Sequence, residues 1–111
     1  MIETVIDTPT FADLQDAAGA EFVTELVKTF LEEGPAMLAE LRGAHAAGAA
    51  DEFRRAAHSL KSNSSTFGAL RLADIARALE LGGMPKEAAT LDSLEEEYWR
   101  VAAALRDLCH E

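Results

Sequence analysis

The stretch DEFRRAAHSLKSNSSTFG, residues 51–68, carries the pattern that decides the fold of this chain. On a helical wheel at about 100° per residue, its apolar and small side chains fall within one stripe, which is typical of a helix that faces a core. The stripe contains Phe53, Ala56, Ala57, Leu60, Ser64 and Phe67. His58 falls about 140° from the centre of that stripe, so we expect its imidazole to point outward. Gly68 is expected to end the helix.

Cationic and short polar side chains surround His58 on the expected helix. Arg54, Lys61, Ser62 and Ser65 lie one or two turns away from it. Two interpretations stand at this point: a solvated polar face that happens to contain a histidine, or a site built around an exposed imidazole. Helical periodicity alone does not separate them.

The length and composition are those of one packed helical domain. A chain of 111 residues corresponds to a single domain over residues 1–111, and it can bury a core without disulfides or metals. Alanine is abundant, whereas valine, isoleucine and proline are few. This composition favours helices over sheets and over disorder.

Charge is distributed unevenly along the chain. The net charge of −10 at pH 7 argues against nucleic-acid binding, because backbone phosphates would be repelled. Residues 54–77 nevertheless carry five bases and one acid, and this segment contains His58. One interpretation is a chance cluster on a solvated face. The other is a local site for an anion or for an acidic protein surface.

The cysteine content and the absence of long apolar runs favour a cytoplasmic location. Cys109 is the only cysteine, so neither a disulfide framework nor a cysteine metal site is expected. The sequence shows no charged-then-apolar leader and no apolar run that approaches the length of a membrane span. We therefore expect a cytoplasmic protein that does not associate with membranes.

Two helices are expected before the histidine helix. A short one over residues 11–17 follows an extended lead-in, and Thr10 is expected to cap it. A long one spans residues 20–47. The pair Gly34-Pro35 interrupts its pattern, so one kinked helix or two separate helices both fit. The apolar stripe continues past the pair, which favours the kinked helix.

Two more helices are expected after the histidine helix, which Asp51 is expected to cap. The first spans residues 69–81 and stops at Gly82-Gly83, and the last begins at Pro85 in an N1-like position. Four main amphipathic helices with short connections must bury their apolar faces against one another. The sequence therefore predicts an all-α protein, an antiparallel four-helix bundle with a short extra N-terminal helix.

The run from His58 to Ala69, HSLKSNSSTFGA, resembles the signature of histidine-containing phosphotransfer (HPt) domains. That signature is a histidine, any residue, leucine, lysine, a small residue that is usually glycine, small polar residues, an apolar residue and Gly-Ala. Downstream residues, among them Leu79 and Glu80, are similar to the family's next helix, and nearly the whole chain matches its length and helix order. Ser62 departs from the usual glycine, but because serine is also small, we expect access to the ring to be kept.

The resemblance implies a function for the exposed histidine. His58 would receive a phosphoryl group from an aspartyl phosphate on a receiver domain and pass it to another receiver. Lys61, one turn on, would support the phosphate as a point charge. The implied partners are receiver domains of response regulators or a hybrid histidine kinase, bound by a monomer. The candidate partner contacts are Arg54, Arg55, Ser62, Ser65 and Arg71.

No cofactor and no autonomous kinase activity are expected. The chain has no nucleotide-binding glycine loop and no paired acids on a strand end to hold Mg²⁺, so the ion and the acyl phosphate would come with the partner. A metal-binding bundle is a first alternative, but His45, His58 and His110 lack a glutamate at the Glu-x-x-His spacing. The second alternative is a non-catalytic adaptor bundle that binds a signalling partner.

Overall fold

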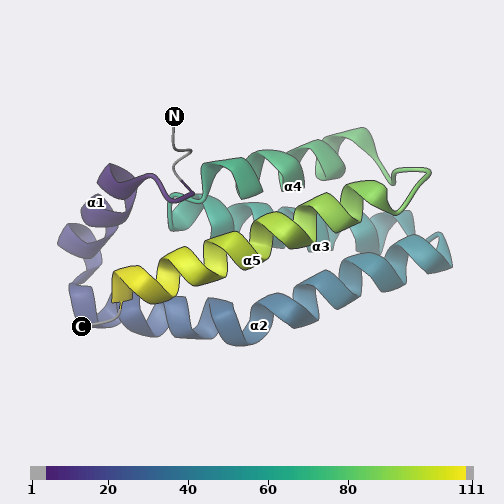
Figure 1. Ribbon diagram of the computed structural model, residues 1–111. Coiled ribbons are helices and arrows are strands. Elements are labelled where there is room, and N and C mark those ends of the chain that lie inside the picture. Colours follow the sequence, from purple (N-terminus) through teal and green to yellow (C-terminus); the bar gives the residue numbers. More distant parts are fainter. Residues whose placement is uncertain (1–4, 110–111) are drawn as a thin grey trace.

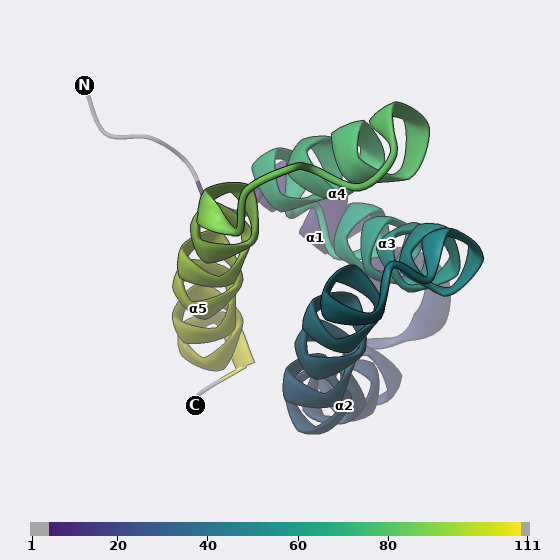
Figure 2. The ribbon, with the colours of Figure 1, turned by 90° about the vertical axis from the view of Figure 1, so that its right-hand side faces the viewer.

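The structure is a computed structural model that describes residues 5–109, and this part of the chain is helical throughout apart from short connections (Figure 1). The helices are α1 (Thr8–Ala18), α2 (Ala20–Ala47), α3 (Ala50–Thr66), α4 (Leu70–Gly82) and α5 (Ala89–Cys109). Helices α2 to α5 form a bundle, seen end-on in Figure 2, and α1 lies at one end of it. The expected all-α bundle with an extra N-terminal helix is confirmed. None of the described helices is long and apolar enough to cross a membrane.

Helix α3 packs between α2 and α4, with the expected stripe turned inward. The buried residues of this stripe are Phe53, Ala56, Ala57, Leu60, Ser64 and Phe67. The ring of Phe67 lies 5.4 Å from that of Phe30 in α2, centroid to centroid. The buried hydroxyl of Ser64 donates a hydrogen bond to the Leu60 carbonyl at 2.6 Å, so the polar group is satisfied. Burial of this stripe fixes the rotation of α3 and leaves the side of His58 free.

Helix α2 runs without a break through Gly34 and Pro35, and its axis changes direction near the middle (Figure 1). The kinked interpretation is therefore the right one. A Cβ atom on Gly34 would overlap the hydroxyl oxygen of Tyr98 in α5. That hydroxyl donates a hydrogen bond to the Phe30 carbonyl at 3.4 Å. The glycine thus makes room for a ring that joins α5 to α2.

Helix α1 begins at Thr8, earlier than expected, because Asp7 and not Thr10 caps it. The Asp7 carboxylate accepts a hydrogen bond from the Thr10 backbone amide at 3.3 Å. The Asp7 amide donates to the Gly68 carbonyl at 2.8 Å, which fastens the start of α1 to the α3–α4 turn. Gly68 follows the end of α3 with a φ of +82°, as the sequence predicts for a C′ glycine. Residues 1–4 of the expected lead-in lie outside the described residues, and its last two residues, Thr8 and Pro9, belong to α1.

Two other helix starts were wrongly predicted. Helix α3 begins at Ala50, so Asp51 lies in its first turn instead of capping it. The cap position is Ala49, which offers no side-chain hydrogen bond and follows the left-handed Gly48 that ends α2. Helix α5 begins at Ala89. Pro85 lies in the connection before it, where its carbonyl is 2.7 Å from Nε2 of His45. This contact joins the connection to α2. The end of the chain that contains His110 lies outside the described residues.

Candidate functional site

His58 lies in the middle of α3, and its side chain is 56% exposed. The neighbouring residues Ala57 and Leu60 are buried, so the helix itself cannot rotate to hide the ring. The outward direction predicted from the helical wheel is confirmed. The fold therefore presents one imidazole from a rigid element to whatever approaches this side of the bundle.

Glu80 of α4 holds one nitrogen of the His58 ring. Its Oε2 atom lies 2.7 Å from Nδ1 of His58. The Glu80 side chain is only 14% exposed, so this carboxylate is a fixed part of the α3–α4 interface. A carboxylate can only accept a hydrogen bond, so Nδ1 carries the hydrogen in this contact. In the neutral ring, Nε2 then keeps a free lone pair on the accessible side.

Lys61 pairs with the second oxygen of the same carboxylate. Its Nζ atom lies 3.0 Å from Oε1 of Glu80. The hydrogen bonds from Lys61 and then from His58 lower the pKa of the Glu80 carboxyl, against the opposing effect of burial. Glu80 is therefore ionised at neutral pH, and one carboxylate links the two residues that the sequence singled out.

Three of the other predicted contacts share the exposed side of α3 with His58. Ser62 and Ser65 follow it at one and two turns, and both are exposed. Arg54 precedes it by one turn, is also exposed, and lies 3.8 Å from the carboxylate of Asp51. These residues form a small, open surface with hydroxyl groups on one side of the ring and a guanidinium group on the other.

The two remaining predicted contacts lie elsewhere. Arg55 lines a shallow hollow that faces α2, beside the histidine surface. Arg71 lies nine residues before Glu80 in α4, about 14 Å along the helix axis. Its Nε atom is 3.5 Å from Oε1 of the buried Glu97 in α5, and Nε of Arg100 is 3.4 Å from the same oxygen. The structure thus places Arg71 beside α5 and away from the ring.

Glu80 is the site residue to which sequence reasoning gave no role. The sequence resemblance placed it only in the helix that follows the histidine helix. A signal was present in the spacing: His58 is ten residues before Gly68 and Glu80 is twelve after it. In a helical hairpin that turns at Gly68, these two positions come to about the same height. A carboxylate facing the histidine could have been found in this way.

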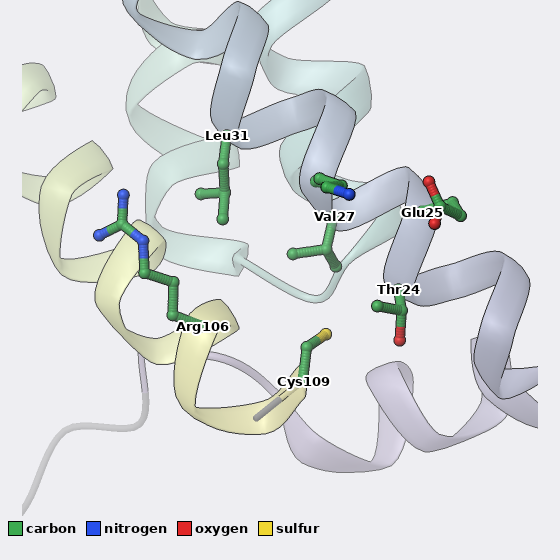
Figure 3. Close-up of a pocket in the computed structure, with 7 residues that line it drawn as sticks. Thr24, Glu25, Val27, Leu31, Arg106 and Cys109 are labelled. Atoms are coloured by element: carbon green, nitrogen blue, oxygen red, sulfur yellow. The ribbon is translucent and has the colours of Figure 1, made fainter. Parts of the chain in front are cut away.

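A separate hollow lies between the start of α2 and the end of α5. Figure 3 shows Val27 and Leu31 extending from α2 on one side and Cys109 on the other. The residues that line it are Thr24, Glu25, Val27, Lys28, Leu31, Arg106 and Cys109. None of the predicted site residues borders this hollow. Among residues 5–109, no group of three or more His, Cys, Asp or Glu side chains is arranged to hold a metal ion.

Comparison with known proteins identifies the family. Residues 25–111 match the Hpt domain. The chain belongs to the Hpt domain family. It is similar to the crystal structure of histidine-containing phosphotransfer protein B (HptB) from Pseudomonas aeruginosa PAO1, with 27% identity and a TM-score of 0.82 over 97% of this chain and 96% of that one. No curated protein matches it.

Membership of the Hpt family confirms the function predicted from the sequence. The chain is a phosphotransfer protein of two-component phosphorelay signalling. Hpt proteins are intermediates in such relays and interact with response regulators and histidine kinases. The family match favours this activity over the adaptor alternative, which shares the fold but not the chemistry.

Proposed function

We propose that His58 is the phosphoacceptor of this Hpt domain and that its Nε2 atom forms the bond to phosphorus. The contact that supports this most directly is the one between Nδ1 and Glu80 at 2.7 Å, in a ring that is otherwise exposed. It leaves Nε2 as the nitrogen that can meet an aspartyl phosphate on another protein. A receiver domain would supply the phosphoryl group, and a second receiver would remove it.

Lys61 is proposed to support the phosphoryl oxygens. It lies one turn from His58 on the side of α4, and its ammonium group is already close to the ring through their shared carboxylate. Phosphoryl transfer depends mainly on positioning and on stabilisation of charge, and a lysine supplies a compact positive charge for this purpose. The metal ion and the acyl phosphate belong to the receiver in this scheme, so the chain needs no kinase activity of its own.

The receiver is proposed to dock over the exposed side of α3. Arg54 and Ser62 lie one turn from the ring and Ser65 two turns from it, while Arg55 extends this surface towards α2. Arg71 lies farther away, beside α5, and would be reached only by a partner that also covers α4. This side belongs to the basic segment of a chain whose net charge is −10, so it complements an acidic partner surface. We further propose that residues 1–111 act as one monomeric domain in the cytoplasm, with receivers or a hybrid histidine kinase as partners.

Replacement of His58 by glutamine tests the proposal. A receiver domain that carries a labelled aspartyl phosphate should transfer its label to the wild-type chain, and this label should be acid-labile. His58→Gln should accept none, because the amide has no nucleophilic ring nitrogen, and its circular dichroism spectrum and melting temperature should stay close to those of the wild type because the side chain is exposed.

His45→Gln is the matched control, since this ring contacts the Pro85 carbonyl on another part of the bundle. It should accept label like the wild type. Persistent label on His58→Gln would overturn the assignment. A wild-type chain that binds receivers but never takes label would instead support the adaptor.

A further inference from the structure

We infer that Glu80 keeps a proton on Nδ1 of His58 throughout the transfer cycle, so that the phosphohistidine of this chain is a rapid donor and not a lasting store. This inference deepens the proposed function and rests on His58 as the phosphoacceptor. It concerns a positioning residue, because Glu80 acts on the phosphoryl group only through the ring and through Lys61.

The two oxygens of Glu80 have different surroundings, and this difference carries the argument. Oε2 contacts Nδ1 of His58 at 2.7 Å, and Oε1 lies 3.0 Å from Nζ of Lys61. Oε1 is shielded from solvent. When Lys61 turns to a phosphoryl group, that shielded oxygen loses its cation. A buried carboxylate without a compensating charge is costly, so once the phosphoryl group is in place the Glu80 carboxylate favours the form of the phosphorylated ring that keeps its Nδ1 proton and is positively charged.

The chemistry of the transfer makes this protonation important. The Nε2 lone pair attacks phosphorus, the Nε2–P bond forms, and the P–O bond breaks with its electron pair left on the aspartate of the donor. The Nδ1 proton stays in place, so the ring becomes a phosphoimidazolium cation opposite Glu80. In onward transfer the Nε2–P bond breaks, its electron pair returns to Nε2, and neutral imidazole is the leaving group. A ring without the Nδ1 proton would have to leave as an imidazolide anion, which is a far poorer leaving group.

Charged groups lie near the ring on α3 and α4, with a further acid on α2 beyond Arg55, and the contact distances single out Glu80. On α3 itself, Arg54 lies one turn before His58 and contacts Asp51, and Lys61 lies one turn after it. On α2, Glu40 lines the hollow on the flank of Arg55. Glu80, on α4, is the acid in direct contact with Nδ1. Removal of its charge should therefore change the protonation of the phosphorylated ring more than removal of another acid.

Glu80→Gln isolates the charge, because an amide oxygen can still accept the hydrogen bond from Nδ1–H. The rate of onward transfer from the phosphorylated chain to an unlabelled receiver is measured against pH. The onward-transfer rate should fall as the pH rises in both proteins. The midpoint of this fall should lie about one pH unit higher in the wild type than in Glu80→Gln. Above both midpoints the variant should transfer about tenfold more slowly and hold its label correspondingly longer.

Two variants control this experiment. Glu80→Asp keeps the charge and should restore the wild-type midpoint, whereas Asp74→Asn removes an exposed acid from the same helix and should leave the midpoint unchanged. Nitrogen NMR of the phosphorylated ring supplies a readout independent of rate, since Nδ1 should lose its proton at lower pH in Glu80→Gln. If that variant does not fold, the pH at which Nδ1 loses its proton is compared by NMR between native and urea-unfolded wild-type phosphoprotein. Loss at the same pH in both would contradict the role of Glu80.

The outcomes separate the two proposals. A wild-type chain that takes no label contradicts the proposed function itself. Label on His58 together with the same pH profile and the same Nδ1 resonance in wild type and Glu80→Gln contradicts only the role of Glu80.

Discussion

Lys61 lies between one negative charge that is part of the fold and another that arrives with the partner. Its Nζ atom is 3.0 Å from Oε1 of Glu80, and the proposed position of the phosphoryl group on His58 is within reach of the same flexible side chain. The pair with Glu80 holds the ammonium group near the ring before any phosphate is present. Exchange between two anions then requires only a rotation of the lysine side chain, with no change in the helices.

Lys61→Ala should slow the first transfer without unfolding the chain. Loss of a cation beside a developing negative charge lowers the rate of transfer. Because this site is partly open to water, we expect the rate of single-turnover label transfer to fall by about tenfold or more. Lys61→Arg should recover part of the rate. Lys86→Ala removes an exposed lysine from the α4–α5 connection and should have no effect. An unchanged rate in Lys61→Ala would remove this residue from the site.

The direction of His58 could be predicted from the sequence, whereas for Glu80 the spacing around Gly68 indicates only a similar height along the hairpin and not the contact itself. The side of a helix on which a residue lies depends only on the 3.6-residue period and on the apolar stripe, and both are local. The contact between His58 and Glu80 depends on how far α4 slides along α3, which is set by the turn at Gly68 and by packing. The surroundings of Arg71 could not be predicted for the same reason, because its proximity in sequence to the histidine helix says nothing of its contact with Glu97 in α5.

Helix α2 illustrates how a residue pair that disfavours helices can lie inside one. Pro35 removes a backbone donor from the helix. Gly34 leaves a gap on the same turn, and the ring of Tyr98 from α5 fills it, with its hydroxyl bonded to the Phe30 carbonyl. The rings of Phe30 and Tyr98 lie 5.6 Å apart, centroid to centroid. The continuity of α2 is therefore supported by packing against α5.

Gly34→Ala should destabilise the protein even though alanine is the better helix former. The new methyl group would overlap Tyr98, and overpacking of this kind costs about 1–3 kcal/mol. Gly43→Ala is a matched control in the same helix, because its Cβ atom would meet no other atom within 4 Å. It should gain up to about 1 kcal/mol from helix propensity alone. Urea unfolding measures the stability change of each variant. Equal gains in Gly34→Ala and Gly43→Ala would show that the Tyr98 ring moves aside freely.

The bundle is closed at one end by α1. Ile6 and Phe11 are buried there, and the backbone amide of Asp7 donates to the Gly68 carbonyl at 2.8 Å. A Cβ atom on Gly68 would lie 2.8 Å from the Asp7 carbonyl oxygen. The α3–α4 turn thus has two roles: it sets the register of the two helices that make the site, and it holds the N-terminal helix.

Gly68→Ala should lower the stability of the whole domain and loosen α1. A side chain at a φ of +82° costs about 1–2 kcal/mol by itself, and the clash with Asp7 adds to this cost. Gly48→Ala provides the comparison, because Gly48 has a left-handed φ of +66° and open space around its Cβ position. Thermal unfolding should show the larger loss for Gly68→Ala, and amide exchange should show faster opening of α1 in that variant alone. Equal losses would mean that the contact with α1 adds nothing.

The arrangement of the whole molecule could be predicted more reliably than the ends of its helices. Four apolar stripes with short connections leave few ways to bury every stripe, so the bundle follows from the pattern. Helix starts depend on which of several adjacent polar groups caps the chain. Asp7 and Thr10 both fit that role in the sequence, and the docking of α1 on Gly68 decides between them.

The single exposed face of α3 also imposes an order of events on the relay. The proposed acceptor ring can be reached only from the side opposite the buried stripe, so a donor and an acceptor receiver compete for the same patch and exclude each other. Transfer must then follow ping-pong kinetics, in which the first partner departs before the second arrives. Between these encounters the proposed phosphohistidine has no partner, and its lifetime sets how long the signal can still be passed on.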